Sequence, residues 1–404
     1  MAGTTATPHP ATATAGNFDL PADRRRARLW FAVALTIALA YPFLDRALGF
    51  NRIGSFLAIA VFVVLAMGLN IVVGYAGLLD LGYAAFFAIG AYTIGLLTSP
   101  SSVFVQKHWV PLWMQNFWAA MAVSWAVAAI FGVLLGAPTL RLRGDYLAIV
   151  TLGFGEIVPT FFLNADAITG GTMGINPIAK PPTFYVFGHA VSFGQTDQRN
   201  WYYLMLGVIL VSLFLVTRLY DSRLGRAWQA VREDEIAASS MGVNLVRTKL
   251  WAFALGASFS GFAGSIYSSA FQYVHPSQFE FVVSIMILAS VILGGIGNVY
   301  GVIIGAILIV SFDRILTDVL TDPLQQLGHL LHSETIASHN LANDRYVVFG
   351  LALVLMMLLR PGGLFPSAQR RAEMTPESDD VRVAETQTLY DVRTENEPAL
   401  GERA

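Results

Sequence analysis

Apolar runs separated by short polar connections fill most of the chain between residues 29 and 368. A helix needs about 20 apolar residues to cross the hydrocarbon core of a bilayer, with a usual range of about 17 to 25. We identify ten candidate crossings, several of them short: 30–48, 54–73, 83–98, 117–137, 145–163, 201–217, 250–271, 280–294, 298–312 and 346–359. The pattern predicts an all-α protein, a polytopic transmembrane helical bundle with about eight to ten membrane segments.

Both ends of the chain depart from this apolar pattern. Residues 1–28 are rich in Ala, Thr and Pro, and residues 369–404 are polar and acidic. Such compositions favour disorder, because they offer little apolar surface to bury. The arginines within 24–28 and the apolar run after them also fit a signal peptide, but the many apolar runs that follow favour a first transmembrane helix. We therefore predict a membrane domain over 29–368 between two disordered tails.

The distribution of Lys and Arg predicts how the helices are oriented in the membrane. With the N-terminus inside and ten crossings, the inside segments carry 18 of the 25 Lys and Arg residues. They include the N-terminal arginines, Arg141 and Arg143, the loop 218–249 and the C-terminal tail. Because the reversed topology would place this excess outside, both termini and the loop 218–249 are predicted to be cytoplasmic.

Composition supports a membrane protein and excludes several kinds of chemistry. The chain is 55% hydrophobic, with a mean hydropathy of +0.57, and its net charge of −2 gives no basic surface for nucleic acid. A chain without cysteine has no disulfides, thiolate catalysis or cysteine metal sites. The seven histidines form no metal-ligand pattern, so we predict no metal site.

The loop 218–249 carries ten charged residues in a chain that is only 13% charged. Each charge at the centre of a membrane helix costs about 2.5–3.5 kcal/mol, so this loop would cost on the order of 25 kcal/mol or more as a span. Its residues nevertheless favour a helix, which we predict near Ala227–Met241 and which Gly242 and Asn244 would end. A solvated connecting loop has the same composition, and that alternative stays open.

The sequence GRAWQAVREDEIAASSMGVN (225–244) resembles the coupling segment of membrane subunits in bacterial ATP-binding-cassette importers. Such segments carry the pattern E-A-A-x-x-x-G and dock into a cleft on the ATPase subunit. The small residues match this pattern, whereas Ile236 occupies the glutamate position. REDEIAASSMGVN resembles the form of this loop in the branched-chain amino-acid importer family. The resemblance implies ATPase-coupling roles for Arg232, Glu233, Asp234, Glu235, Ala237, Ala238, Gly242 and Asn244.

Three further parts of the chain resemble the same family. GLNIVVGYAGLLDLGYAAFFAIGAY (68–92) is similar to its N-terminal signature. TLGFGEIV (151–158), followed by TGGTMGI (169–175), is similar to the longer of its two permease types. VILGGIGNVYGVIIGA (291–306) and RPGGLFP (360–366) are similar to its C-terminal end.

The resemblance covers about 30–368 and implies a permease subunit that moves branched-chain or other hydrophobic amino acids into the cytoplasm across the bacterial cytoplasmic membrane. The implied partners are two ATPase subunits, a second permease, an extracytoplasmic substrate-binding protein and membrane lipid. ATP and Mg²⁺ would bind the ATPase subunits, with no cofactor in this chain. A phosphate-binding loop needs a lysine directly after a glycine, and none of Lys107, Lys180 and Lys249 has that position. Permeases for urea and short amides look alike here, so the substrate stays open.

Two sets of residues are candidates for contact with the solute or with the binding protein. Short, glycine-broken helices line the substrate path in many transporters, but GGIGN (294–298) fits a plain tight turn equally well. Glu156 lies within an apolar run, where it would contact a polar solute group, relay a proton or hold helices together, and we favour the last. The candidate path residues are Glu156, Thr151, Gly77, Gly294, Gly295, Gly297 and Asn298. The candidate outer-face contacts, in a segment that also fits a bland turn, are Gly170, Gly171 and Thr172.

Two other classes of function make different demands on the sequence. A secondary carrier or channel acting alone would use intramembrane charge pairs for ion coupling, and such charges are sparse here. An integral-membrane enzyme would need reactive polar residues clustered at one membrane face, and we find no Ser/His/Asp arrangement or catalytic carboxylate pair. We therefore predict that the chain is not an enzyme.

Overall fold

The computed structural model describes residues 33–47 except 34 and 46, then 53–139, 145–186, 189–194 and 198–312, and parts of 350–365. The chain divides into two compact units, Met1–Ile53 and Gly54–Ala404. In the first unit, an apolar helix covers Leu35–Asp45, which lies inside the first predicted crossing. The predicted tails 1–28 and 369–404 lie outside the described residues, so their disorder stays a prediction.

Long apolar helices build the second unit, and the prediction of an all-α transmembrane bundle is confirmed. Seven helical segments of the described chain are long and apolar enough to cross a membrane. They contain α2 (Ile53–Leu69) with the π-helix η1 (Asn70–Tyr75), α3 (Tyr83–Thr98), α5 (Phe117–Thr139), α6 (Asp145–Asn164), α8 (Gln198–Tyr220), α11 (Leu245–Phe271) and α12 (Phe281–Gly294). The ninth predicted crossing is α13 (Val299–Ser311), a shorter apolar helix, and the tenth lies largely outside the described residues.

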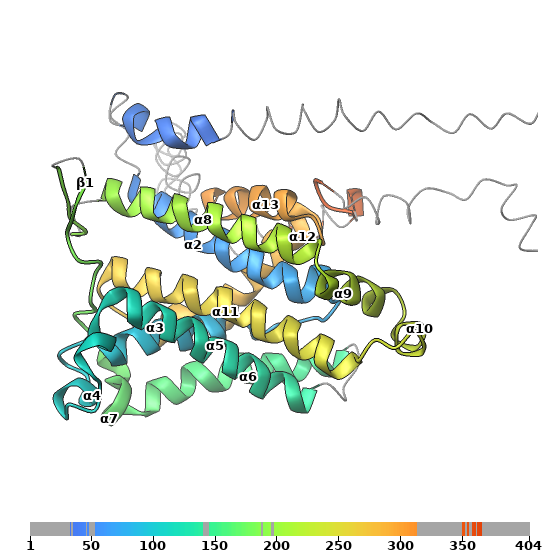
Figure 1. The fold of residues 1–404 in the computed structure, drawn as a ribbon, viewed down its shortest axis with the longest axis horizontal. Coiled ribbons are helices and arrows are strands. Elements are labelled where there is room, and N and C mark those ends of the chain that lie inside the picture. The colour runs from blue at the N-terminus through green and yellow to red at the C-terminus, as the bar shows by residue number, and fades with distance from the viewer. Residues whose placement is uncertain are drawn as a thin grey trace, which may run out of the picture. The chain divides into compact units, whose positions relative to one another are not determined.

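Short elements connect the long helices at the two ends of this bundle (Figure 1). One end carries α4 (Val103–Gln106), η2 (Leu112–Gln115), α7 (Asp166–Thr169), η3 (Gly171–Met173), η4 (Pro276–Phe279) and a small antiparallel hairpin, β1 (Phe184–Val186) and β2 (His189–Val191). The other end carries α9 (Arg223–Glu233) and α10 (Glu235–Ser240). The loop that was predicted to lie outside the membrane therefore forms two helices that project from the bundle.

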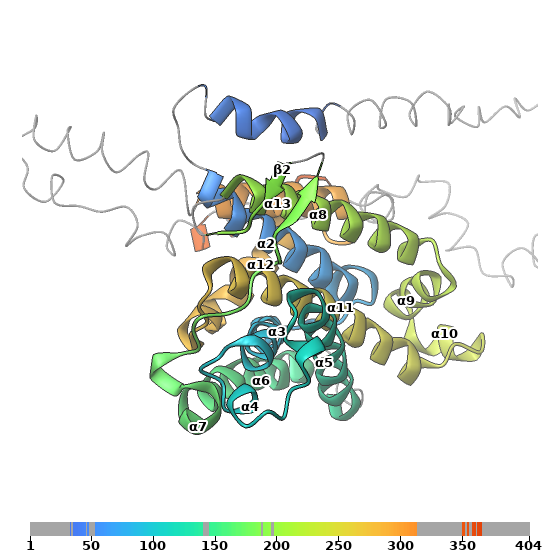
Figure 2. The ribbon, with the colours of Figure 1, turned by 60° about the vertical axis from the view of Figure 1, so that its left-hand side comes forward.

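The central helix of this unit is α11, which packs along both α5 and α3 (Figure 2). Most of α11 is buried, whereas α6 and α8 leave most of their residues unburied. Glycines permit the close approach: a Cβ at Gly90 of α3 would collide with the backbone of Gly261 in α11. In a bilayer, the hydrophobic effect does not drive helices together, because lipid tails are as apolar as the side chains. Small residues at the contact let the helix backbones approach closely and so increase van der Waals packing.

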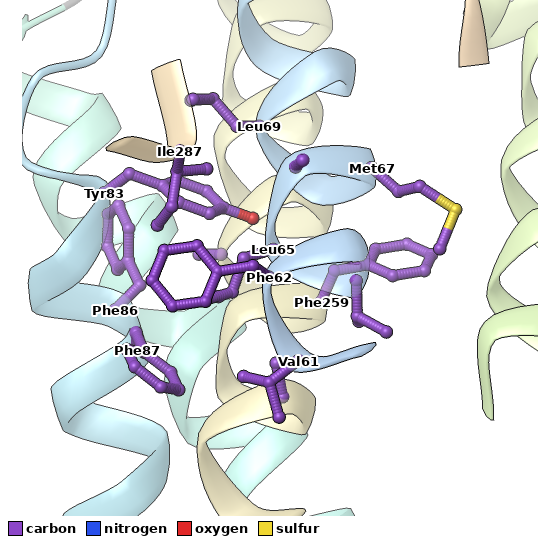
Figure 3. Packing of buried hydrophobic residues seen from close by; sticks show 14 of the residues in the cluster. Val61, Phe62, Leu65, Met67, Leu69, Tyr83, Phe86, Phe87, Phe259 and Ile287 are labelled. Atoms are coloured by element: carbon purple, nitrogen blue, oxygen red, sulfur yellow. The ribbon is translucent and has the colours of Figure 1, made fainter. Parts of the chain in front are cut away.

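Large side chains fill the space between α2, α3 and α11 (Figure 3). Phe62 and Leu65 of α2 share one buried cluster with Phe86 of α3 and Phe259 of α11. Tyr83 is also fully buried, and its hydroxyl donates a hydrogen bond of 2.7 Å to the carbonyl oxygen of Gly256. Burial of that polar group is tolerable because its hydrogen bond is made.

Candidate coupling and translocation site

The charged loop forms two short helices, so the prediction of a single helix over Ala227–Met241 is wrong. Helix α9 ends at Glu233, and Asp234 adopts an extended conformation with φ −153° and ψ 114°. Its carboxylate Oδ1 accepts hydrogen bonds from the backbone N–H groups of Ile236 at 2.7 Å and Ala237 at 3.0 Å. An aspartate that caps a new helix in this way competes with continuation of the previous one.

The end of α10 matches one part of the prediction and corrects another. Gly242 has φ +86°, and its N–H donates to the carbonyl oxygen of Ser239 at 3.0 Å, which ends the helix as predicted. Asn244 does not end this helix. It begins α11, because its side-chain oxygen accepts a hydrogen bond from the N–H of Arg247 at 3.0 Å.

Three side chains attach α9 and α10 to the membrane helices. Trp228 is fully buried, and its Nε1–H donates to the carbonyl oxygen of Thr248 at 2.7 Å. Arg232 donates from Nη1 to the carbonyl oxygen of Gly74 at 2.5 Å. Lys249 forms a 2.6 Å ion pair with Glu235, the only salt bridge among the described residues. The two helices are therefore bonded to α11 and to the π-helix η1.

The outer surface of α10 carries apolar side chains that contact little of the chain. Ile236 is 71% exposed and Met241 is 85% exposed, and Ala237 and Gly242 lie beside them in solvent. Ala238 is buried instead, so only part of the predicted small-residue surface is available to a partner. Sequence reasoning missed Ile236 and Met241 as contact residues, although large apolar residues in a charged segment were the available signal. We call Ile236, Ala237, Met241 and Gly242 the α10 surface.

The glycine-rich segment 294–298 is a tight turn between α12 and α13. Gly295 and Gly297 have positive φ angles of 114° and 87°, which suit glycine, and Asn298 caps α13 through bonds from the N–H groups of Tyr300 and Gly301. Its side-chain amide donates to the carbonyl oxygen of Phe365 at 3.0 Å. The turn therefore also holds a segment that lies much later in the sequence.

Residues 362–365 pack directly on this turn. The N–H of Leu364 donates to the carbonyl oxygen of Leu293 at 2.8 Å, and that of Phe365 donates to Gly294 at 3.1 Å. A Cβ at Gly295 would collide with the backbone of Phe365. Two separate glycine-rich motifs of the sequence thus form one unit.

The π-helix Asn70–Tyr75 joins this turn to the charged helices. Asn70 is fully buried, and its Oδ1 accepts a hydrogen bond of 3.0 Å from the N–H of Gly297. One turn later, the carbonyl oxygen of Gly74 accepts the bond from Arg232. A π-helix inside a membrane helix often marks a functional site, because its wider turn changes which backbone groups are free. We call this meeting point, which comprises Asn70, Gly74, Arg232 and Gly297, the π-helix junction.

The connection 76–82 follows this junction in the chain, and two of the predicted path residues, Gly77 and Thr151, lie in it or against it. Gly77 has φ +69° and lies against the side chain of Arg232. Thr151 of α6 is buried, and its hydroxyl oxygen accepts a hydrogen bond from the N–H of Leu81 at 3.0 Å. Both residues therefore contact the connection or its neighbours, and their place on the substrate path stays a prediction.

Asp80 is a buried acid in the same connection. Its Oδ1 accepts a bond of 2.9 Å from the N–H of Gly82, and its Oδ2 has no hydrogen-bond partner among the described residues. Burial raises the pKa of the Asp80 carboxyl to about 7, and the hydrogen bond from Gly82 opposes part of this rise.

Glu156 lies apart from the π-helix junction. It is exposed on α6, and its side chain forms no hydrogen bond or ion pair with any residue that the structure describes. The interpretation that we favoured, a structural bond between helices of this chain, therefore has no support in the described contacts.

The predicted outer-face residues form a folded turn beyond the other end of α11. Gly170 has φ +72° and Gly171 has φ +50°, and the carbonyl oxygen of Thr172 lies 3.1 Å from Nε2 of His275. Since α11 has 27 residues, its two ends are about 40 Å apart. The turn thus lies one membrane thickness from α9 and α10.

These features define an α-helical, multi-pass membrane protein with two short charged helices, α9 and α10, at one end. No group of three or more His, Cys, Asp or Glu residues within the described part of the chain is placed to hold a metal ion. A family model for the permease component of branched-chain amino acid transport systems matches residues 51–357. The chain belongs to this permease family, whose members are components of transport systems.

Named relatives agree with the family. The high-affinity branched-chain amino acid transport system permease protein LivM of Salmonella typhimurium is 38% identical over 378 residues, covering 88% of this chain and 80% of the relative. LivM of Escherichia coli K12 is 37% identical over 378 residues, which again cover 88% of this chain and 80% of the relative. The permease protein LivH of Escherichia coli K12 is 23% identical over 252 residues, covering 61% of this chain and 79% of LivH. No solved structure matches the chain.

Proposed function

We propose that this chain is the longer permease subunit of an ATP-binding-cassette importer that moves branched-chain or other hydrophobic amino acids into the cytoplasm. The family match and the LivM relatives support this substrate class. The α10 surface supports ATP-driven coupling, because it is partly apolar and exposed, and because Glu235 of α10 and Arg232 of α9 bond the two helices to α11 and η1. This chain lacks a phosphate-binding loop, so ATP and Mg²⁺ would bind separate subunits.

In this proposal, the ATPase subunit docks on the α10 surface and moves α9 and α10 as one body. The ion pair of Lys249 and Glu235 passes this displacement to α11, which packs along α3 and α5. Arg232 passes it to the π-helix junction, and Asn70 passes it on to the turn at Gly297. A coupling segment needs such rigid bonds, because a floppy connection would absorb the motion of its partner.

The remaining partners follow the same scheme. A second permease completes the membrane part, two ATPase subunits lie on the cytoplasmic side, and an extracytoplasmic binding protein meets the turn Gly170–Thr172. The excess of Lys and Arg in the loops supports cytoplasmic termini. The bacterial cytoplasmic membrane is the location that the family resemblance implies. A permease for urea or short amides is the competing substrate class, and a carrier that acts without ATP is the competing mechanism.

Gly242 offers a sharp test of docking on the α10 surface. Nothing lies within 4 Å of a Cβ built at this glycine, so the folded chain has room for a side chain. Gly242→Ala adds only the strain of a positive φ, roughly 1 kcal/mol. Gly242→Trp adds that strain together with bulk that would block a closely docked protein.

The experiment compares both variants in membrane vesicles that contain the complete transport system. We expect Gly242→Ala to retain most ATP-driven leucine uptake and Gly242→Trp to lose it, with both chains present at equal amounts. Co-purification should show that the ATPase subunits are lost only from Gly242→Trp. Normal uptake by Gly242→Trp would remove α10 from the mechanism. Leucine uptake without ATP by the purified chain would favour the carrier.

A further inference from the structure

Glu156 is unusual among the charged side chains of the membrane-spanning helices. It lies eleven residues after Asp145 in a helix of 20 residues, about 16 Å along the axis and near the middle of the span. The other charged residues in the described spans all lie close to a span end: Asp145, Arg199, Arg218, Arg247, Lys249 and Glu280.

Its side chain points away from the bundle. Glu156 is exposed, and neighbouring residues share that face of α6: Ile157 is 66% exposed, Thr160 is exposed, and nothing lies within 4 Å of a Cβ at Gly153. The contacts of α6 lie on its opposite side, chiefly with α3 (Figure 1). No described residue therefore covers the face of α6 with Gly153, Glu156, Ile157 and Thr160, which we call the α6 face.

Lipid is a poor occupant of the α6 face. An acidic or basic side chain at the centre of a bilayer is costly, and hydrocarbon offers it no hydrogen-bond donor. The outward face of α8 has the composition that suits lipid, since Val211, Phe214 and Leu215 are apolar and all about half exposed. The α6 face differs from that surface because it carries the carboxylate of Glu156, the hydroxyl of Thr160 and, at Gly153, a glycine with free space around it.

We propose that the α6 face is the surface on which the second permease subunit packs, with Glu156 bonded to a donor of that subunit. The inference rests on the proposed function, since it needs a second permease. Only a membrane-embedded partner reaches the middle of α6, which excludes the ATPase subunits and the soluble binding protein. Gly153 lets a partner helix approach closely, and Thr160 adds a second polar group. A carboxylate at that interface borders the space between the two permeases.

Photo-crosslinking at two matched positions tests this surface directly. The photoreactive amino acid p-benzoylphenylalanine is placed at Ile157 on α6 or at Val211 on α8, two exposed aliphatic positions near the middle of their helices. Each variant is co-expressed with the second permease and the ATPase subunits of the same transport system, and the complex is purified before irradiation. We expect a crosslink to the second permease from position 157 and crosslinks to lipid alone from position 211.

The outcomes separate the interface from the proposed function. If the complex purifies with its ATPase subunits but position 157 crosslinks only to lipid, the interface is refuted while the importer assignment stands. A crosslink to the second permease from position 211 alone refutes it equally. If no second permease or ATPase co-purifies, the proposed function itself fails.

A second measurement tests the role of the charge. Glu156→Leu makes α6 more apolar, so membrane insertion of the chain should not suffer, whereas the bond to the partner is lost. We expect several-fold less second permease to co-purify with Glu156→Leu, and a partial return with Glu156→Gln, which keeps a polar group. Val211→Leu is the matched control and should leave co-purification unchanged. Full recovery of the second permease with Glu156→Leu would contradict the proposed bond.

Discussion

The ion pair between Lys249 and Glu235 yields a prediction in which the two partners behave differently. The Lys249 side chain is only 6% exposed, whereas that of Glu235 is 30% exposed. Removing either charge leaves the other without its partner, but water reaches Glu235 far more than Lys249. Loss of the glutamate charge should therefore destabilise the chain more than loss of the lysine charge.

The size of this difference follows from the burial of each group. Breaking a buried pair costs about 3–5 kcal/mol when the remaining charge is fully enclosed. Glu235→Gln leaves the buried Lys249 ammonium without a charged partner. We expect the free energy of unfolding to fall by about 2 kcal/mol rather than more, because residue 235 is partly exposed and allows some water to enter. Lys249→Met keeps the volume of the side chain and leaves a carboxylate that can be hydrated, with an expected loss below about 1 kcal/mol.

The double variant completes the test. Glu235→Gln with Lys249→Met leaves no unpaired charge, so its stability should return to within about 1 kcal/mol of the original chain. The assay is equilibrium unfolding by SDS in mixed detergent micelles, with uptake of leucine measured in parallel. Stability should recover in the double variant while uptake stays low, because the bond from α10 to α11 is still missing. Equal losses from both single variants, or additive losses in the double variant, would refute the reasoning.

Two further predictions concern Asp80 and the glycine contact of α3 with α11. Because burial raises the Asp80 pKa from 3.8 to about 7, its ionised form opposes folding, and stability should fall by up to about 4 kcal/mol as the pH rises from 4 to 8. Asp80→Asn should remove this decline in thermal melting curves recorded across that range. A decline that persists in Asp80→Asn would show that another group causes it. Gly90→Ala forces a methyl group against the backbone of Gly261 and should destabilise the chain by about 3 kcal/mol, whereas Gly207→Ala on α8 meets open space and should be neutral in the same melts.

The membrane-spanning pattern could be predicted from the sequence alone. A span is defined by a local property, the length of an apolar run, and seven such runs correspond to long helices of the structure. The charged loop 218–249 was also recognisable, because no arrangement of the other helices would make its insertion favourable. The end of α10 at Gly242 was predictable for a similar reason, since glycine adopts its positive φ at little energetic expense.

The detailed structure of that loop was less predictable, because two local preferences compete there. Good helix-forming residues favour one helix through Asp234, but the carboxylate of Asp234 captures two backbone N–H groups and starts a second helix. Asn244 has the same ambiguity, since an asparagine near a helix boundary suits either an end or a beginning. Its hydrogen bond from Arg247 decides in favour of the beginning of α11.

Only the tertiary structure shows which distant segments meet. Asn70, Arg232 and Gly297 lie far apart in the sequence, yet hydrogen bonds bring all three to one π-helix. Likewise, the sequence shows that Glu156 lies in an apolar helix, but it does not show whether Glu156 faces the bundle or points away from it. That depends on which side of α6 packs against α3. The apolar runs and the charged loop are local properties of the sequence, whereas the junction and the uncovered α6 face depend on long-range packing that no short window of residues contains.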